Sequence, residues 1–142
     1  MQISRKADYA LRAMTIMAGL GPDRSLQAQE LAEQGKIPIK FLEQILLVLK
    51  KAGMLRSKRG VGGGYRLNRE SRLISVAEIM EAVDGELIQL VDPDDFPSFD
   101  GSAGIVHYLS LAERSINDTL RQTKLEDLAG HDAGDAMVGY GI

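Results

Sequence analysis

The sequence contains no cysteine among its 142 residues. This absence excludes disulfide bonds, zinc sites built from thiolates and iron–sulfur clusters held by thiolates alone. Histidine is almost as scarce, because only His107 and His131 are present. The sequence therefore gives little support to catalysis, and we expect a protein that is not an enzyme and that binds no metal or other cofactor.

The sequence also lacks an apolar run of about 18 residues, and it lacks a basic segment followed by a short hydrophobic one at its start. Neither a membrane span nor a secretory signal is predicted, so we expect a cytoplasmic protein with no membrane partner. Hydrophobic residues make up 44% of the chain, which suits one compact domain of ordinary size with a projecting element.

Basic residues are nearly missing from the second half of the chain. Residues 1–72 contain 14 Lys/Arg and 6 Asp/Glu, whereas residues 73–142 contain 3 and 14, although the net charge of the whole chain is only −3. A basic half joined to an acidic half predicts that one end faces a polyanion while the other faces solvent, a partner or a second subunit. Chance drift of surface charge is the alternative.

Apolar residues at helical spacing predict a first helix over Ile3–Ala18, which the Gly- and Pro-containing segment Gly19–Asp23 ends. We expect a short second helix with Ser25 as its N-cap and Gly35 as its C-cap. Together these features predict two helices in the first quarter of the chain.

A longer third helix is predicted after Pro38, which fits its first turn. It ends in Lys50 and Lys51, where cations suit the negative end of the helix dipole. Its apolar side is expected to carry Phe41, Leu42, Ile45, Leu46 and Leu49. A short helix, a turn with glycine and a longer helix are typical of a helix-turn-helix.

A β-hairpin is predicted next, with strands over Met54–Arg59 and Tyr65–Asn68 around the loop Gly60–Gly64. Its flanks are basic, as in the wing of a winged helix. The predicted fold class is therefore mainly α with a small β-hairpin wing, a winged helix-turn-helix followed by a long dimerisation helix.

A fourth helix is predicted at the start of the second half. Ser75 and Glu78 match a capping box at its N-terminus, and it ends before Gly85. Further on, Thr123 is expected to cap a last short helix through Leu128. We divide the chain into a winged helix-turn-helix DNA-binding domain (1–85), an acidic connector (86–101), a dimerisation helix with a short C-terminal helix (102–130) and a flexible tail (131–142).

An apolar stripe at spacings of three and four predicts the long helix between the connector and the last helix. In so small a chain we expect this stripe to pack on its twin in a second subunit, although folding back on the first helix is the alternative. The dimerisation residues are Ile105, Leu109, Ala112, Ile116 and Leu120.

Three polar residues near the start of the third helix are the candidates for reading bases in a major groove. Lys40 could reach phosphate or guanine, Glu43 could accept a hydrogen bond from cytosine, and Gln44 could pair with adenine. A solvated Glu43 is the alternative. In the wing we expect Arg59 to enter a narrow minor groove, where negative potential is concentrated. The remaining DNA-binding candidates are basic: Arg5, Lys6, Arg56, Lys58 and Arg66.

An alternative hypothesis is that the loop Gly60–Gly64 binds the phosphate of a nucleotide. Neither the G-x-x-x-x-G-K-[ST] nor the G-x-G-x-x-G pattern is present, and a loop between antiparallel strands lacks the helix N-terminus that such sites use. We therefore do not expect a nucleotide site.

Three segments, Met1–Ala10, Phe41–Gln44 and Arg59–Leu67, resemble the Rrf2 family of winged-helix transcriptional regulators. The resemblance extends from Met1 to about Leu128. It implies a homodimer that is held together by the long helix and that binds a palindromic operator in double-stranded DNA.

Many members of that family carry three cysteines after the fourth helix, where they hold a cluster or sense iron or nitric oxide. The corresponding stretch here, Asp92–Ala103, has none. The resemblance therefore points to the cysteine-free branch, which includes a repressor of cysteine metabolism. An iron–sulfur or redox- and iron-responsive regulator that lacks its cysteine ligands, with carboxylates or His107 in their place, is the alternative.

The end of the chain is also similar to that branch, in Thr123–Ala129 and in Tyr140, Gly141 and Ile142. There the terminus docks in the active site of cysteine synthase (O-acetylserine sulfhydrylase), so the resemblance implies that these last three residues bind this partner. A flexible peptide offers an apolar side chain and a carboxylate, which backbone nests capture. A tail without a partner is the alternative.

Overall fold

The computed structural model describes residues 2–21 and 23–131, so the predicted partner-binding residues Tyr140, Gly141 and Ile142 lie outside them. The described part is mainly helical with a two-stranded antiparallel hairpin, and the predicted fold class is confirmed. In chain order the elements are α1 (Arg5–Ala18), α2 (Ala28–Gly35), α3 (Ile39–Lys51), β1 (Leu55–Lys58), β2 (Gly64–Leu67), η1 (Ser71–Leu73), α4 (Val76–Asp84), η2 (Pro93–Asp95), α5 (Ser102–Gln122) and α6 (Leu125–Gly130).

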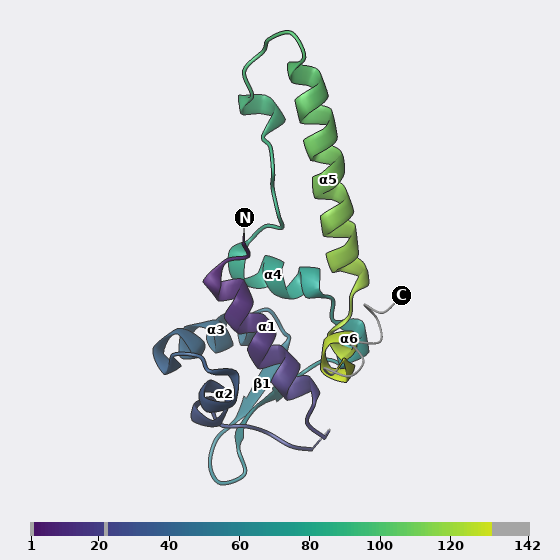
Figure 1. Ribbon diagram of the computed structural model, residues 1–142. Coiled ribbons are helices and arrows are strands. Elements are labelled where there is room, and N and C mark those ends of the chain that lie inside the picture. Colours follow the sequence, from purple (N-terminus) through teal and green to yellow (C-terminus); the bar gives the residue numbers. More distant parts are fainter. Residues whose placement is uncertain (1, 22, 132–142) are drawn as a thin grey trace.

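The helices α1 to α4, the hairpin and α6 form one body, from which α5 projects as an arm (Figure 1). Helix α1 lies at the centre of this body and packs against α2, α3, α4 and α6. The loop between β1 and β2 and the tip of α5 are at opposite ends of the molecule (Figure 1). The core between the helices is apolar and includes Met14, Leu31, Leu42, Leu46 and Ile79.

Helix α1 begins two residues later than predicted because Ser4 caps it. The Ser4 hydroxyl accepts a hydrogen bond from the backbone N–H of Ala7 at 3.0 Å, which satisfies one of the free N–H groups of the first turn. The same hydroxyl donates to the carboxylate of Asp84 at 2.7 Å. This contact joins the start of α1 to the end of α4.

Both predicted caps of α2 are wrong. The N-cap is Gln27, not Ser25, and the backbone N–H of Gln27 donates to Glu30 at 3.2 Å. At the other end Lys36 adopts the left-handed conformation, with φ 54° and ψ 50°. Gly35 is the last helical residue, and its lack of a side chain matters for packing, since a Cβ there would lie 2.8 Å from Cδ1 of Ile37.

Helix α3 buries most of the predicted side. Leu42, Leu46 and Leu49 are fully buried and Ile45 nearly so, whereas Phe41 is 53% exposed, so its predicted burial is wrong. Adjacent residues on a helix point about 100° apart, and Phe41 turns instead toward the ring of Tyr9 on α1, 6.3 Å away between centroids. Pro38 is the N-cap rather than a residue of the first turn.

The hairpin is extended by one further backbone pair. Within it Leu55 pairs with Leu67 and Arg56 with Arg66. Beyond it, Leu26 and Tyr65 exchange two hydrogen bonds, Tyr65 N–H to Leu26 O at 2.7 Å and Leu26 N–H to Tyr65 O at 3.0 Å. Strand β2 is therefore attached, near the loop end of the hairpin, to the segment that enters α2.

Ser75 caps α4 as predicted, by accepting a hydrogen bond from the N–H of Glu78 at 3.0 Å. The carboxylate of Glu78 instead pairs with Arg69 at 2.7 Å, so the capping box is only half formed. Thr123 does not cap α6. Its N-cap is Lys124, whose N–H donates to Asp127 at 2.8 Å.

Residues 86–101 run back along α5 (Figure 1). Three hydrogen bonds hold them there. The N–H of Ile88 donates to the side-chain oxygen of Asn117 at 3.2 Å, the side-chain NH2 of Asn117 donates to the carbonyl oxygen of Ile88 at 3.0 Å, and the N–H of Leu90 donates to Glu113 at 2.7 Å. Among the described helices, α5 included, none is long and apolar enough to cross a membrane.

Candidate nucleic-acid interface

The outward side of α3 presents a stripe of exposed polar residues. Lys40, Glu43 and Gln44 are all exposed, as predicted for residues that could reach a ligand, and Leu47 and Lys51 continue the same side. The spacing of three, four, seven and eleven residues from Lys40 places all five on one face of a helix. This face is opposite the buried one, so it is available to a macromolecule.

A groove of about 510 Å³ separates the start of α1 from α3. The predicted phosphate-contacting residues Arg5 and Lys6 line it, together with Gln44 from the stripe. The structure thus brings three of the predicted site residues from two helices to one groove. Its remaining lining is mostly apolar and includes Phe41 and Val48.

The wing carries its cations on one face of the hairpin. Arg56 and Arg66 lie directly opposite each other in the register, and Lys58 follows on the same side two residues after Arg56. Like charges directly opposite each other destabilise a hairpin, so an anion between them would be favourable. Arg59 is exposed where β1 leads into the glycine loop, and Val61 is fully exposed at its tip.

Lys50 joins α3 to the wing. Its ammonium group donates a hydrogen bond to the hydroxyl of Ser57 on β1 at 2.6 Å. Leu55, Ser57, Tyr65 and Leu67 share one face of the hairpin, so this bond joins that face to α3. Sequence reasoning placed Lys50 at the dipole end of the helix and did not predict this contact.

Sequence reasoning also missed Arg12, which holds the helix-turn-helix together. Its guanidinium donates to the carbonyl oxygens of Gly35 at 3.1 Å and Lys36 at 3.3 Å, at the turn between α2 and α3. It also pairs with Asp8 at 2.8 Å and lies 5.3 Å from the ring centroid of Tyr9. The spacing of Asp8 and Arg12 by four residues was the available signal.

Replacing Arg12 by alanine should lower the free energy of unfolding by about 1 kcal/mol, because the turn loses two charge-assisted bonds that are partly screened by solvent. Denaturant unfolding followed by circular dichroism measures the change. The matched variant Asp8→Asn removes the ion pair but keeps the bonds to the turn, so its effect should be smaller. Equal losses in the two variants would show that the bonds to the turn contribute nothing.

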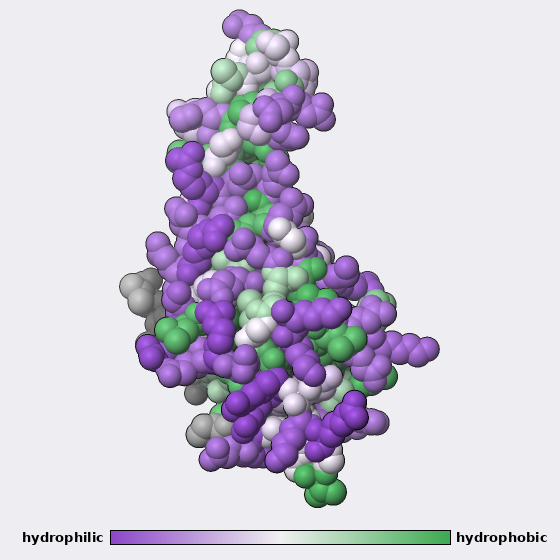
Figure 2. All heavy atoms as spheres, turned by 180° about the vertical axis from the view of Figure 1, so that it is seen from behind, coloured by the Kyte–Doolittle hydropathy of each residue, from purple (hydrophilic) through white to green (hydrophobic). Residues whose placement is uncertain are grey.

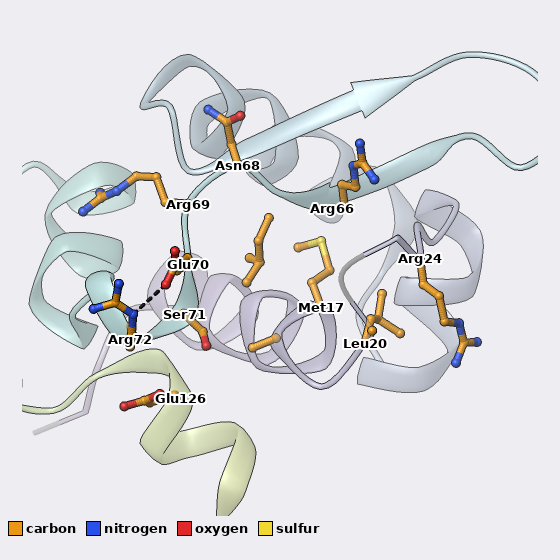
Figure 3. Close-up of a pocket in the computed structure, with 13 residues that line it drawn as sticks. Met17, Leu20, Arg24, Arg66, Asn68, Arg69, Glu70, Ser71, Arg72 and Glu126 are labelled. Carbon is orange, nitrogen blue, oxygen red and sulfur yellow. Dashed lines mark hydrogen bonds and ion pairs between the residues drawn. The ribbon is translucent and has the colours of Figure 1, made fainter.

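A second hollow, of about 470 Å³, lies between the end of α1 and the base of the wing (Figure 3). Arg24, which sequence reasoning did not single out, and Arg66 both line it, and their side chains point in different directions (Figure 3). Ion pairs hold Arg69 to Glu78 and Arg72 to Glu70. The arginines do not converge on one point, so the hollow extends the basic surface beside Arg66.

The predicted dimerisation residues separate into two groups along α5. Ile105, Leu109 and Ala112 are exposed between the tip and the middle of the arm, whereas Ile116 and Leu120 are half-buried near its base. Leu120 packs against the cluster around Val76 and Met80. Figure 2 shows apolar surface among hydrophilic side chains on the projecting arm. The tip of the arm therefore offers an apolar face to another molecule.

The chain is similar to known proteins in both sequence and fold. The model of the Rrf2 family, described as an iron-dependent transcriptional regulator, matches residues 3–131. A Mycobacterium tuberculosis protein that is named as an HTH-type transcriptional regulator is 33% identical over 132 residues, which cover 92% of this chain and 82% of that protein. The HTH-type transcriptional regulator IscR of Xenorhabdus nematophila is 34% identical over 134 residues, which cover 90% of this chain and 79% of IscR.

Among solved structures, CymR, the global cysteine regulator of B. subtilis, superposes with a TM-score of 0.80 at 26% identity, over 93% of this chain and 98% of that one. The names of all these proteins describe transcriptional regulators and not enzymes. They agree with the prediction that this chain is not an enzyme.

The word iron in the family description raises the question of a metal site. The sequence has no cysteine, and within residues 2–21 and 23–131 no group of three or more His, Asp or Glu is placed to hold a metal ion. His107, the one histidine near the connector, instead packs edge-on against Tyr108 at 5.0 Å. The described residues therefore do not fit iron or an iron–sulfur cluster.

Proposed function

The chain belongs to the Rrf2 family of transcriptional regulators, as its sequence implied, and we propose that it binds double-stranded DNA as a homodimer. Helix α3 of each protomer enters the major groove and the wing enters the adjacent minor groove. The observation that carries this proposal is the exposed stripe on α3 that begins at Lys40, together with the facing arginines Arg56 and Arg66 of the wing.

The stripe assigns roles to three residues. Glu43 accepts a hydrogen bond from the amino group of a cytosine, Gln44 pairs with an adenine, and Lys40 contacts guanine or phosphate. A carboxylate among phosphates is costly unless it meets a donor. For this reason Glu43 contributes more to specificity than to affinity.

The basic residues outside α3 contact the backbone and the minor groove. Arg59 enters the narrow minor groove next to the half-site, where negative potential is high. Arg5 and Lys6 contact phosphates near the start of α1, and the outer face of the wing contacts them through Arg56, Lys58 and Arg66. These contacts position the protein on the duplex and make its binding dependent on salt.

The homodimer forms through the apolar face at the tip of α5, and its two-fold symmetry requires a palindromic operator. Residues 1–85 then form the DNA-binding domain, 86–101 the connector and 102–130 the dimerisation unit. We propose that the protein represses transcription by occupying its operator, which places it in the cytoplasm with the DNA.

The finer proposal is that the regulated genes serve cysteine and sulfur metabolism, through a complex with cysteine synthase. The likeness to CymR supports it, since that protein is named as a cysteine regulator. The similarity of Thr123–Ala129 to the cysteine-free branch of the family adds support. The proposed contact residues Tyr140, Gly141 and Ile142 lie outside the described residues. Isothermal titration calorimetry with cysteine synthase, using the wild type and a variant that lacks residues 140–142, tests this contact. Equal heats from the two proteins would refute it.

Selection of bound duplexes from random sequence tests the DNA-binding proposal. We expect enrichment of a palindrome with cytosine and adenine in each half-site. A second selection in the presence of cysteine synthase should give the same palindrome at higher yield. If a folded protein enriches no sequence at low salt, the proposal is wrong, and if added enzyme leaves the yield unchanged, only the finer proposal is wrong.

A further inference from the structure

Leu47 is an apolar residue at the centre of the outward face of α3. Its side chain is 53% exposed, although its neighbours on that face are the polar residues Glu43, Gln44 and Lys51. Leu47 is not part of the core, which α3 fills from its other side with the fully buried Leu46 and Leu49. A lone exposed leucine on a protein surface is ordinary, but this one lies in the middle of the stripe that we place in the major groove.

The chemistry of the major groove suggests what this side chain meets there. Every base pair presents hydrogen-bonding groups in that groove, but the C5-methyl group of thymine is the only methyl group that an unmodified base pair presents there. Lys40 and Lys51 lie on either side of Leu47 along the helix, and their attraction to phosphates draws this face toward the DNA. We propose that Leu47 packs against a thymine methyl group and so determines specificity for thymine in each half-site.

This inference rests on the proposed function, because it assumes that α3 enters the major groove. It also fixes a distance within the operator. Glu43 and Leu47 are one helical turn apart, which is about 6 Å along the helix axis. With the helix lying along the groove, that rise corresponds to about two base pairs. The thymine should therefore lie about two base pairs from the cytosine that Glu43 reads.

Replacement of thymine by deoxyuridine in the selected operator tests the inference, since it removes only the methyl group. We expect the wild type to lose about fourfold in affinity when one half-site carries the replacement, and about fifteenfold when both do. Both protomers of the Leu47→Ala variant carry the change, so its affinity for the unmodified operator should also be about fifteenfold lower than that of the wild type. This variant should bind the thymine and deoxyuridine operators equally well. Fluorescence anisotropy with labelled duplexes measures each affinity.

Leu73→Ala is the matched control, because Leu73 is 47% exposed and lies on η1, which packs against α6. It should retain both the wild-type affinity and the discrimination. The inference is wrong if no deoxyuridine replacement weakens the wild type, or if Leu47→Ala still discriminates. Should a folded protein bind no duplex at all, the proposed function fails instead. Circular dichroism of both variants confirms that they are folded.

Discussion

Gly64→Ala should lower the free energy of unfolding by about 3 kcal/mol, because this residue has both a strained backbone and no room for a side chain. Its φ is +123°, and a Cβ there would overlap the carbonyl oxygen of Leu26 and lie 2.6 Å from its carbon. The two hydrogen bonds between Leu26 and Tyr65 would have to break. Thermal and denaturant unfolding measure the loss.

The same variant should weaken operator binding by at least about tenfold, which is the value of one charge-assisted contact. Gly60→Ala is the matched control, because Gly60 also has a positive φ, +92°, but a Cβ there would meet none of the described atoms within 4 Å. Its loss of stability should be about 1 kcal/mol, from backbone strain alone. Similar losses at the two positions would contradict the tight attachment of the wing to the start of α2.

Leu109→Glu should convert the dimer into a monomer. The two-fold axis places both new carboxylates in or next to the apolar interface, and burying unpaired charges there costs several kcal/mol. The dimer dissociation constant should rise by about 100-fold or more. Operator affinity should fall by a similar factor, because each monomer holds only one half-site. Analytical ultracentrifugation and anisotropy measure the two effects.

Leu111→Glu is the control for this variant. Leu111 is 48% exposed on the same helix, but a separation of two residues places it about 160° away from Leu109 around the axis. The dimer should survive this change. If Leu111→Glu dissociates the dimer and Leu109→Glu does not, the helix uses another face and the predicted stripe is wrong.

Patterns with a strict period gave the most accurate predictions. The spacing of apolar residues predicted both the buried side of α3 and the long helix α5. A helical period is read from many residues, so the prediction still holds when one residue departs from it. Phe41 was that exception, since an aromatic ring on α1 offered it a partner outside the core. The wing was predictable because its glycine loop and flanking strands are local in sequence.

Features that depend on contacts between distant segments could not be predicted. Lys36 takes the left-handed position that Gly35 was expected to occupy, and Arg12 from α1 binds the carbonyl oxygens of both residues. Likewise, the carboxylate of Glu78 pairs with Arg69 instead of completing the capping box with Ser75. Sequence spacing alone does not show which of several local partners a long side chain will choose.

The most direct test of the central claim is a titration of the selected operator with the wild-type protein at several salt concentrations. If the five phosphate-contacting cations of each protomer, ten in the dimer, neutralise phosphates, the logarithm of the affinity should fall with the logarithm of the salt concentration with a slope of about −9. Two results would contradict the claim that DNA binds to α3 and to the basic residues of the wing. One is an affinity that does not change with salt, and the other is no binding at low salt by a folded dimer.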